Sequence, residues 1–451
     1  MELPGQLLDS LEGVKGFDKQ AFKQVHVSGE QITSVRINPF KLSGSPKALS
    51  FGEGLGEVLW SKYGYYLKSR PSFTFDPFFH AGCYYVQEAS SMFLEQALKQ
   101  TVDLSKPLKV LDLCAAPGGK STHIQSILSK DSLLVSNDVI RSRVNVLKDN
   151  IIKWGCENVV VTNNDPRSFT KLQNYFDVIV VDAPCSGSGL FRRDPAAIDE
   201  WSKNNVQLCS QRQQRILADV WPALKKDGIL IYSTCSYSTD ENEEIVAWIS
   251  KNFSVERYIL KVVDDWGIVE SDGGYRFWPD KVKGEGFFLS CFQKKDGESD
   301  GSTRTKNKPE QANKKEMELI EKWVENEGRV FIRYLNTVYA WPENHLTDFG
   351  FLLEQLRVIY SGILTGELMR DKLVPDHALA MSKAVPDTIY QTALNYEQSI
   401  QYLQRKEINT NTERKGWQLV TYQQHPLGWI NVLSNRINNY YPKELRILRD
   451  I

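Results

Sequence analysis

The sequence predicts an α/β protein with a Rossmann-like, doubly wound domain at its centre. Between residues 109 and 293, short apolar runs alternate with amphipathic stretches, which is the pattern of a parallel sheet joined by crossover helices. The runs are nearly continuous in valine, isoleucine and leucine, as in strands that are buried on both faces. In a sheet of this kind, ligands bind beyond the carboxyl ends of the strands.

Five apolar runs predict the central strands, and two later runs predict strands that complete the sheet. The expected strands are residues 109–113, 133–138, 158–163, 177–182, 228–234, 253–260 and 286–293. Amphipathic stretches between the central strands predict helices over residues 120–129, 142–155 and 205–228. Gly228 is expected to end the last of these helices. A further helix is expected over residues 87–98, leading into the first strand.

The chain has 451 residues, which is too long for one ordinary core, and its composition divides it into parts. Residues 295–315 are polar, rich in Gly, Ser, Asn and charge, and lack apolar periodicity, which predicts a flexible linker. The expected division is an aromatic-rich N-terminal region at 1–100, the doubly wound domain at 101–294, the linker, an intermediate domain at 316–400 and a C-terminal region at 401–451.

The composition is that of an ordinary soluble protein, with 41% hydrophobic and 25% charged residues. No apolar run approaches the roughly 20 residues that cross a bilayer. The first twenty residues have neither a basic nor an apolar segment typical of a secretion signal, so a cytoplasmic location is expected. Seven widely spaced cysteines without a CxxC pair argue against a disulfide framework and against a metal site.

The formal net charge of −1 gives no sign of a nucleic-acid partner, but the charge is unevenly distributed. Residues 401–451 carry a net charge of +4, which offers a local surface for phosphate groups. The basic residues of this tail are Arg405, Lys406, Arg414, Lys415, Arg436, Lys443, Arg446 and Arg449, and the acidic ones are Glu407, Glu413, Glu444 and Asp450.

A glycine turn follows the first predicted strand, in the sequence LDLCAAPGGKSTHI at residues 111–124. The Pro-Gly-Gly at 117–119 allows the backbone to approach a ligand before the next helix begins. The spacing matches neither the GxGxxG of nicotinamide-binding proteins nor the phosphate-binding P-loop. By itself, this turn is a weak indication of a nucleotide-type ligand.

Two aspartates at the ends of the next strands strengthen that indication. Asp138 lies about twenty residues after the glycines, where a carboxylate accepts hydrogen bonds from ribose hydroxyls. Asp165 follows the third strand, where an adenine amino group could bind. Either aspartate alone is better explained as a solvated turn or a helix cap. Together with the glycine turn, they predict a nucleotide-type site.

Two cysteines follow the fourth and fifth strands. DVIVVDAPCSGSG places Asp182 at the tip of the fourth strand and Cys185 in the turn after it, and GILIYSTCSYSTDENEE places Cys235 at the tip of the fifth. A lone cysteine near a strand end is more often structural than reactive. A pair in turns rich in glycine or serine, with Asp182 beside it, favours a chemical role at the same edge of the sheet.

These motifs resemble one known family. The set CAAPGGK, SND, DAPCSGSGLFRRDP and YSTCSYSTDENE is similar to the RNA cytosine-5 methyltransferases of the Nol/Nop/Sun type. SVRINPFKL and HAGCYYVQEASSM resemble that family's N-terminal region, and HPLGWINVLSNRINNYYPKELRIL resembles the PUA-type end of its bacterial RsmF-like branch, which modifies 16S ribosomal RNA. The resemblance implies a methyltransferase domain between an α+β N-terminal RNA-recognition region and a PUA-like RNA-binding region.

The resemblance also implies a role for each motif residue. Cys235 would be the nucleophile, Cys185 would assist product release, and Asp182 would contact the base and the cofactor. Lys120 would belong to the active site, by lowering a thiol pKa or by contacting the cofactor carboxylate, although an ordinary lysine at a helix start is an equal alternative. The implied S-adenosylmethionine-binding residues are Cys114, Ala115, Ala116, Pro117, Gly118, Gly119, Lys120, Asp138, Asp165 and Asp182.

The implied reaction makes use of these residue types. Carbon 5 of cytosine becomes nucleophilic once a thiolate has added to carbon 6, which gives a covalent intermediate. The ring nitrogen N3 gains charge in that step, so Asp182 would serve as a proton donor or relay. A second thiol could assist the later release, and the target base would have to leave its stack to reach the pocket.

The expected partner is RNA, either ribosomal RNA or the small ribosomal subunit, and the protein is expected to act as a monomer without a membrane. Three alternatives remain open from the sequence. The substrate could be tRNA, the enzyme could methylate a protein or small molecule, or the chain could be a non-enzymatic ribosome-assembly factor that retains the fold. Only cytosine-5 chemistry requires both Cys185 and Cys235.

Overall fold

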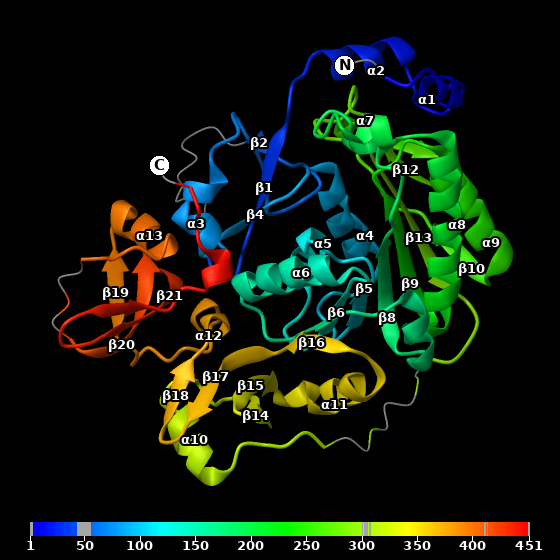
Figure 1. Ribbon diagram of the computed structural model, residues 1–451. Coiled ribbons are helices and arrows are strands. Elements are labelled where there is room, and N and C mark those ends of the chain that lie inside the picture. Colours follow the sequence, from blue (N-terminus) through cyan, green and yellow to red (C-terminus); the bar gives the residue numbers. More distant parts are fainter. Residues whose placement is uncertain are drawn as a thin grey trace.

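The computed structural model describes residues 3–42, 56–299, 301, 305, 308–409, 412 and 414–449. In this part of the chain, one large mixed sheet lies beside three four-stranded sheets. Figure 1 shows the large sheet in cyan and green, with the N-terminal region (blue), the intermediate region (yellow) and the C-terminal region (orange and red) around it. Part of the expected linker, together with Glu413 and Asp450 of the basic tail, lies outside the described residues.

The predicted doubly wound sheet is confirmed. Its parallel strands are β5 (Lys109–Asp112), β6 (Leu133–Asn137), β7 (Val159–Thr162), β8 (Phe176–Asp182) and β9 (Leu224–Thr234). They lie in the order β9-β8-β5-β6-β7, so the chain reverses its direction across the sheet between β5 and β8. In folds of this kind, the crevice at the reversal is where ligands bind.

Antiparallel strands extend the sheet at both edges. Beyond β9 lie β10 (Val255–Tyr258), β11 (Val269–Ser271), β12 (Gly274–Phe277) and β13 (Phe287–Lys294). The two later predicted runs are therefore strands, as expected. At the other edge, β16 (Val358–Ser361) pairs with β7. The intermediate region thus adds a strand to the central sheet, which the sequence did not predict.

Helices cover both faces of this sheet. They are α4 (Leu94–Thr101), α5 (Gly119–Ile127), α6 (Arg141–Trp154), α8 (Lys203–Val220) and α9 (Glu243–Asn252), whereas α7 (Ala197–Glu200) packs beside the N-terminal helices. The prediction that Gly228 ends α8 is wrong, because α8 ends at Val220 and Gly228 is an interior residue of β9. Pro222 has no N–H group with which to continue the helix, and a short 3-10 turn leads directly into the strand.

The N-terminal region forms an antiparallel sheet that is attached to α5. It contains α1 (Gly5–Ser10), α2 (Lys19–Val27), β1 (Thr33–Ile37), β2 (Gly56–Glu57), β3 (Gly64–Leu67), α3 (Pro77–His80) and β4 (Tyr84–Val86). The fully buried Arg36 of β1 donates hydrogen bonds to Thr122 Oγ1 (2.6 Å) and Ser126 Oγ (2.8 Å) of α5. This guanidinium joins the N-terminal sheet to the helix that follows the glycine turn.

Two further sheets make up the last third of the chain. The intermediate region contains α10 (Lys314–Ile320), β14 (Arg329–Tyr334), β15 (Thr337–Pro342), α11 (Leu346–Gln355), β16, β17 (Ile363–Met369), β18 (Lys372–Pro375) and α12 (His377–Met381). The C-terminal region contains β19 (Gln391–Leu394), α13 (Tyr396–Leu403), β20 (Gly416–Tyr422), β21 (His425–Val432) and β22 (Ile437–Asn439). Because β19 pairs with β20, this last sheet begins before residue 401. Within the described ranges, no helix combines the length and the apolar character needed to span a bilayer.

Gly155 ends helix α6 where that helix meets α12. Its φ of +89° is left-handed, and a Cβ there would lie 2.4 Å from the carbonyl oxygen of Met381. We expect Gly155→Ala to lower the free energy of unfolding by about 2 kcal/mol, through left-handed strain and this clash. Gly29 also has a positive φ but open space around it, so Gly29→Ala should cost only about 1 kcal/mol. Urea denaturation measures both losses, and equal losses would contradict a tight contact between the helices.

Candidate active site

The residues singled out in the sequence lie along the carboxyl edge of the central sheet. Each follows one of the parallel strands, at the edge of the sheet where ligands bind in folds of this kind. Residues 114–120 follow β5, Asp138 follows β6, Asp165 follows β7, Asp182 ends β8 with Cys185 in the next turn, and Cys235 follows β9.

The glycine turn places the backbone next to this crevice. Gly118 has a φ of +114°, and it is the residue that precedes α5. No side chain caps the start of α5, so its first N–H groups are suited to a ligand carboxylate. A Cβ on Gly119 would lie 3.3 Å from the ring of Tyr85, which leaves little room for a larger residue.

Asp138, which follows β6, is hydrogen bonded to the glycine turn. Its carboxylate accepts hydrogen bonds from the backbone N–H of Ile140 (2.9 Å) and of Ala116 (3.3 Å). Arg143 Nη1 lies 3.7 Å from the same carboxylate, and Nη2 of the same side chain donates to the Ala116 carbonyl oxygen. The aspartate is 3% exposed. It therefore lies at the edge of the crevice where a ribose would be held, and it also fixes the turn.

Two further features of this edge fit S-adenosylmethionine, and the sequence did not reveal them. The Oδ1 atom of Asp112, at the end of β5, is buried and has no hydrogen-bond partner among the described residues, so it is available to a donor group. Val139 and Ile140 are exposed to 54% and 47%, which is unusual for such side chains and suits contact with an adenine ring. The residues present thus fit the cofactor that the resemblance implies.

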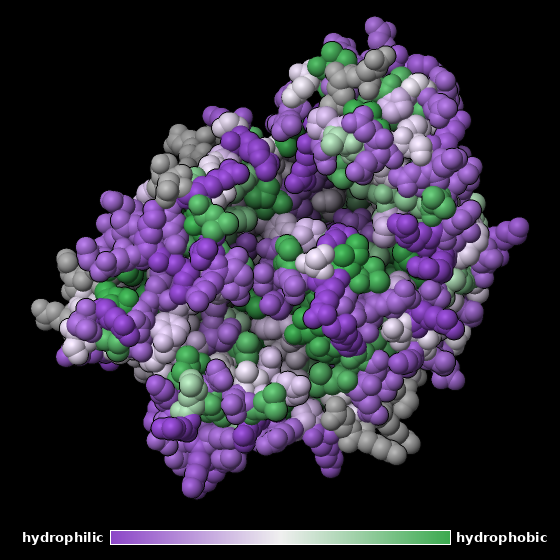
Figure 2. Space-filling view, in the orientation of Figure 1, coloured by the Kyte–Doolittle hydropathy of each residue, from purple (hydrophilic) through white to green (hydrophobic). Residues whose placement is uncertain are grey.

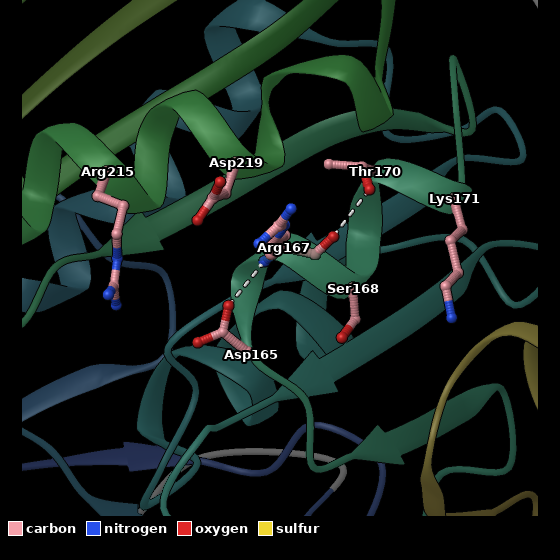
Figure 3. A pocket seen from close by; sticks show the side chains of 7 residues that line it. All are labelled: Asp165, Arg167, Ser168, Thr170, Lys171, Arg215 and Asp219. Carbon is pink, nitrogen blue, oxygen red and sulfur yellow. Dashed lines mark hydrogen bonds between the residues drawn. The ribbon is translucent and has the colours of Figure 1, made fainter.

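Asp165 lies beside a hollow whose lining includes neither thiol. The carboxylate of Asp165 accepts a hydrogen bond from Arg167 N (3.0 Å) and caps the 3-10 helix η4 (Pro166–Lys171). Figure 3 shows η4 facing Arg215 and Asp219 of α8 across a hollow of about 700 Å³. The two thiols lie outside this hollow, in the turns that follow β8 and β9.

The two cysteines converge, although 50 positions separate them in the chain. Cys185 Sγ lies 3.1 Å from Cys235 Sγ, and both side chains are half-buried. Both are free thiols. The spatial convergence expected from the sequence is therefore present.

Lys120 and Asp182 form an ion pair beside the thiols. Lys120 Nζ lies 2.7 Å from Asp182 Oδ2, and the hydroxyl of Ser233 donates to Asp182 Oδ1 at 2.8 Å. Burial alone would lower the pKa of Lys120, but the Asp182 carboxylate more than offsets it, so the pKa is raised and the ammonium stays charged. Lys120 is thus held by Asp182, at the end of β8.

The environment distinguishes Cys185 from an activated thiol. Its hydrogen bond with Cys235, its burial and the nearby charge of Glu241 raise the pKa of Cys185 well above the ordinary value. Cys185 is therefore a neutral thiol at physiological pH. Burial also raises the pKa of Cys114 in the glycine turn, which disfavours its thiolate.

Asp112, at the end of β5, should make the free energy of unfolding depend on pH. Burial raises the pKa of Asp112 to about 7 from an ordinary value of 3.8. A carboxyl whose pKa is raised on folding stabilises the fold below its unfolded pKa and loses that contribution as the pH rises to the folded value. We expect Asp112→Asn to gain stability relative to the wild type between about pH 4 and 7, by up to about 1.4 kcal/mol per pH unit. Urea denaturation at several pH values measures the difference, and a constant offset would contradict the raised pKa.

Comparison with known proteins places this architecture in a family. The family model described as 16S rRNA methyltransferase RsmB/F matches residues 99–293. The N-terminal domain of 16S rRNA methyltransferase RsmF matches residues 3–89, and the methyltransferase RsmF PUA domain matches residues 390–447. The three models follow one another along the chain in the order in which the structure places the three regions.

Relatives match over most of the chain. Ribosomal RNA small subunit methyltransferase F of Psychromonas ingrahamii is 29% identical and covers 98% of this chain and 97% of that protein. The protein of the same name from Pectobacterium atrosepticum is 28% identical and covers 91% of this chain and 89% of its own.

Solved structures share the central fold. A methyltransferase homolog protein from Pyrococcus horikoshii matches with a TM-score of 0.50 at 28% identity, over 65% of this chain and 100% of that one. NSun6 from the same organism, solved with SFG, matches with a TM-score of 0.53 at 18% identity, over 65% of this chain and 99% of that one, and shows the fold alone. The fold, the strand-end geometry and the three family models agree, and the chain belongs to the RsmB/F family of RNA methyltransferases, with the N-terminal and PUA domains of its RsmF branch.

Proposed function

We propose that this chain transfers a methyl group from S-adenosylmethionine to carbon 5 of a cytosine in 16S ribosomal RNA, through a covalent bond between Cys235 and the base. The observation that carries the proposal is the 3.1 Å approach of the Cys185 and Cys235 sulfur atoms, next to the Lys120–Asp182 pair. The name that the relatives bear supports 16S ribosomal RNA as the substrate.

The first step is the attack of Cys235 on the base. The Cys235 thiolate forms a bond from Sγ to carbon 6, and N3 takes up a proton as the ring electrons shift. Asp182, which is paired with Lys120 and hydrogen bonded by Ser233, relays that proton from solvent to N3. When bound, S-adenosylmethionine supplies the methyl group that carbon 5 takes up. The assignment of Cys235 as the nucleophile is the one that the family resemblance implies.

The second step restores the aromatic ring and frees the enzyme. Carbon 5 loses its proton to solvent, the carbon 5–carbon 6 double bond re-forms, and the bond from carbon 6 to Cys235 Sγ breaks. Cys185 enters this step as a neutral thiol 3.1 Å away, so it protonates the departing sulfur and then regains a proton from solvent. N3 returns its proton through Asp182.

Two surfaces support RNA as the partner. One is a small pocket between the N-terminal sheet and the methyltransferase domain, which Arg70 and Arg193 line together with Glu88 and Glu285, and Figure 2 shows a hollow on this face of the molecule. On the C-terminal sheet, Arg414 lies over the ring of Tyr390 (4.8 Å), and such exposed pairs of arginine and aromatic rings suit nucleotide contacts. We also propose that the protein acts as a monomer in the cytoplasm.

RNA that carries 5-fluorocytosine should trap the enzyme, because the fluorine at carbon 5 cannot leave as a proton does. We expect a covalent complex on a denaturing gel with the wild type and none with Cys235→Ala. With ordinary RNA, Cys185→Ala should accumulate the adduct, because the leaving sulfur lacks its proton donor.

Cys156→Ala serves as the control, since Cys156 is a half-buried free thiol in the loop after α6, away from this centre. The absence of trapping in the wild type would leave a non-enzymatic ribosome-assembly factor as the better account. Bisulfite mapping of ribosomal RNA and tRNA from cells with and without the protein identifies the class of RNA that is modified.

The basic tail should contribute to RNA binding without affecting the cofactor. Lys443 and Arg446 are exposed at the end of the C-terminal region. We expect the double variant Lys443→Ala/Arg446→Ala to bind RNA more weakly, with a salt dependence reduced by about 1.4 in slope for two lost phosphate contacts. Lys251→Ala, on α9 at the opposite flank (Figure 1), should behave as the wild type. If the affinity for S-adenosylmethionine fell in parallel, the separation of the two sites would be wrong.

A further inference from the structure

One buried carboxylate joins the two cysteine turns. Glu241 is 0% exposed and lies in the 3-10 turn between β9 and α9. Its Oε2 atom accepts hydrogen bonds from the hydroxyls of Ser186 (2.5 Å) and Ser236 (2.6 Å). These serines directly follow Cys185 and Cys235 in the chain. A single side chain therefore holds the residue next to each thiol.

The second oxygen of this carboxylate strengthens the same connection. Oε1 of Glu241 accepts from Ser186 N (2.8 Å) and from Gln213 Nε2 (3.2 Å). Gln213 also donates to the carbonyl oxygen of Pro184 (3.0 Å), so the residues on both sides of Cys185 are held. All four donors to Glu241 are uncharged.

A buried carboxylate held only by neutral donors is an unusual element of a protein interior. Burying a charge without a counterion destabilises a fold, and the hydrogen bonds offset that cost only in part. Burial accordingly raises the pKa of Glu241, although four hydrogen bonds act in the opposite direction. Such networks rigidify their surroundings when every member is satisfied, as here.

Strand pairing alone does not set the position of the thiols. The parallel ladder between β8 and β9 ends at the pair Asp182–Ser233, and Cys185 lies three residues beyond it. Beyond that pair, the backbone hydrogen bond from Gly189 N to Cys235 O (2.7 Å) also connects the two turns. The hydroxyls of Ser186 and Ser236 also lie 3.3 Å apart, and Glu241 accepts a hydrogen bond from each of them immediately beside the cysteines.

We propose that Glu241 is a positioning residue, which sets the separation of the two thiols by holding Ser186 and Ser236 on one carboxylate. Its catalytic consequence rests on the function proposed above. The placement of the thiols is independent of that function, and it can be measured without RNA or cofactor.

Two substitutions of Glu241 separate the effect of its hydrogen bonds from the effect of its charge. Glu241→Ala removes all four hydrogen bonds. Glu241→Gln keeps one carbonyl oxygen for Ser186 N and Gln213, and its NH₂ group can donate to the serine hydroxyls, which rotate to accept. If the position of the thiols depends on these hydrogen bonds, Glu241→Gln should keep the thiol separation that Glu241→Ala loses.

Phenylarsine oxide, which binds two neighbouring thiols at once, measures the separation directly. We expect the full-length wild type and Glu241→Gln to bind it with similar affinity and Glu241→Ala to bind at least about 10-fold more weakly, because displaced thiols no longer chelate one atom. Glu244→Ala, an exposed glutamate three positions on, should match the wild type. Cys185→Ala should lose chelation altogether.

Circular dichroism establishes the folded fraction of each variant. Ser236→Ala removes one of the hydrogen bonds to Glu241, so we expect a smaller loss of affinity for phenylarsine oxide than with Glu241→Ala. Wild-type affinity in folded Glu241→Ala, or a glutamine variant as weak as the alanine variant, would overturn the proposal.

Methyl transfer then tests the catalytic consequence. We expect Glu241→Ala to lower kcat about 10- to 100-fold with the KM for S-adenosylmethionine unchanged, and Glu241→Gln to recover most of that loss. An increase in the KM for S-adenosylmethionine with kcat unchanged would contradict a role at the thiols. If the arsenical results hold but even the wild type fails to methylate RNA, the positioning role stands and the proposed function fails.

Discussion

The parallel pairing of β8 with β9 is the constraint on which the candidate site depends. The register places Asp182 opposite Ser233, so the turns that carry Cys185 and Cys235 leave the sheet at the same height. Because adjacent residues of a strand point to opposite faces, a slip of one residue would turn Asp182 away from Ser233. Parallel strands also require a crossover, which is why residues 50 positions apart become neighbours.

The outer regions are attached to the same sheet through buried contacts. Arg36 joins the N-terminal sheet to α5, and β16 makes the intermediate region part of the central sheet. Gly155 allows α6 to approach α12 closely. These contacts give the surfaces proposed to bind RNA a defined position relative to the thiols, which a base taken out of its stack would require.

Features that depend on local pattern could be predicted from the sequence. Apolar runs identified the strands of the central sheet, and their carboxyl ends led to Asp138, Asp182, Cys185 and Cys235. Gly228 was assigned wrongly because the amphipathic pattern continues past Pro222, and a glycine within a strand resembles one that ends a helix. The pairing of β16 with β7 joins segments almost 200 residues apart, so no local pattern could indicate it.

The parts of the site that the sequence did not reveal depend on burial. Asp112 and Glu241 are acidic residues among 56 aspartates and glutamates, and only their enclosure distinguishes them. The unpartnered Oδ1 of Asp112 and the four donors around Glu241 arise from tertiary contacts.

Mass-spectrometric mapping of the peptide that carries the trapped 5-fluorocytosine nucleotide tests the central claim most directly. The account predicts that the wild-type adduct lies on the peptide containing Cys235, with Cys185 unmodified. An adduct on Cys185, or on a cysteine outside these two turns, would contradict the account.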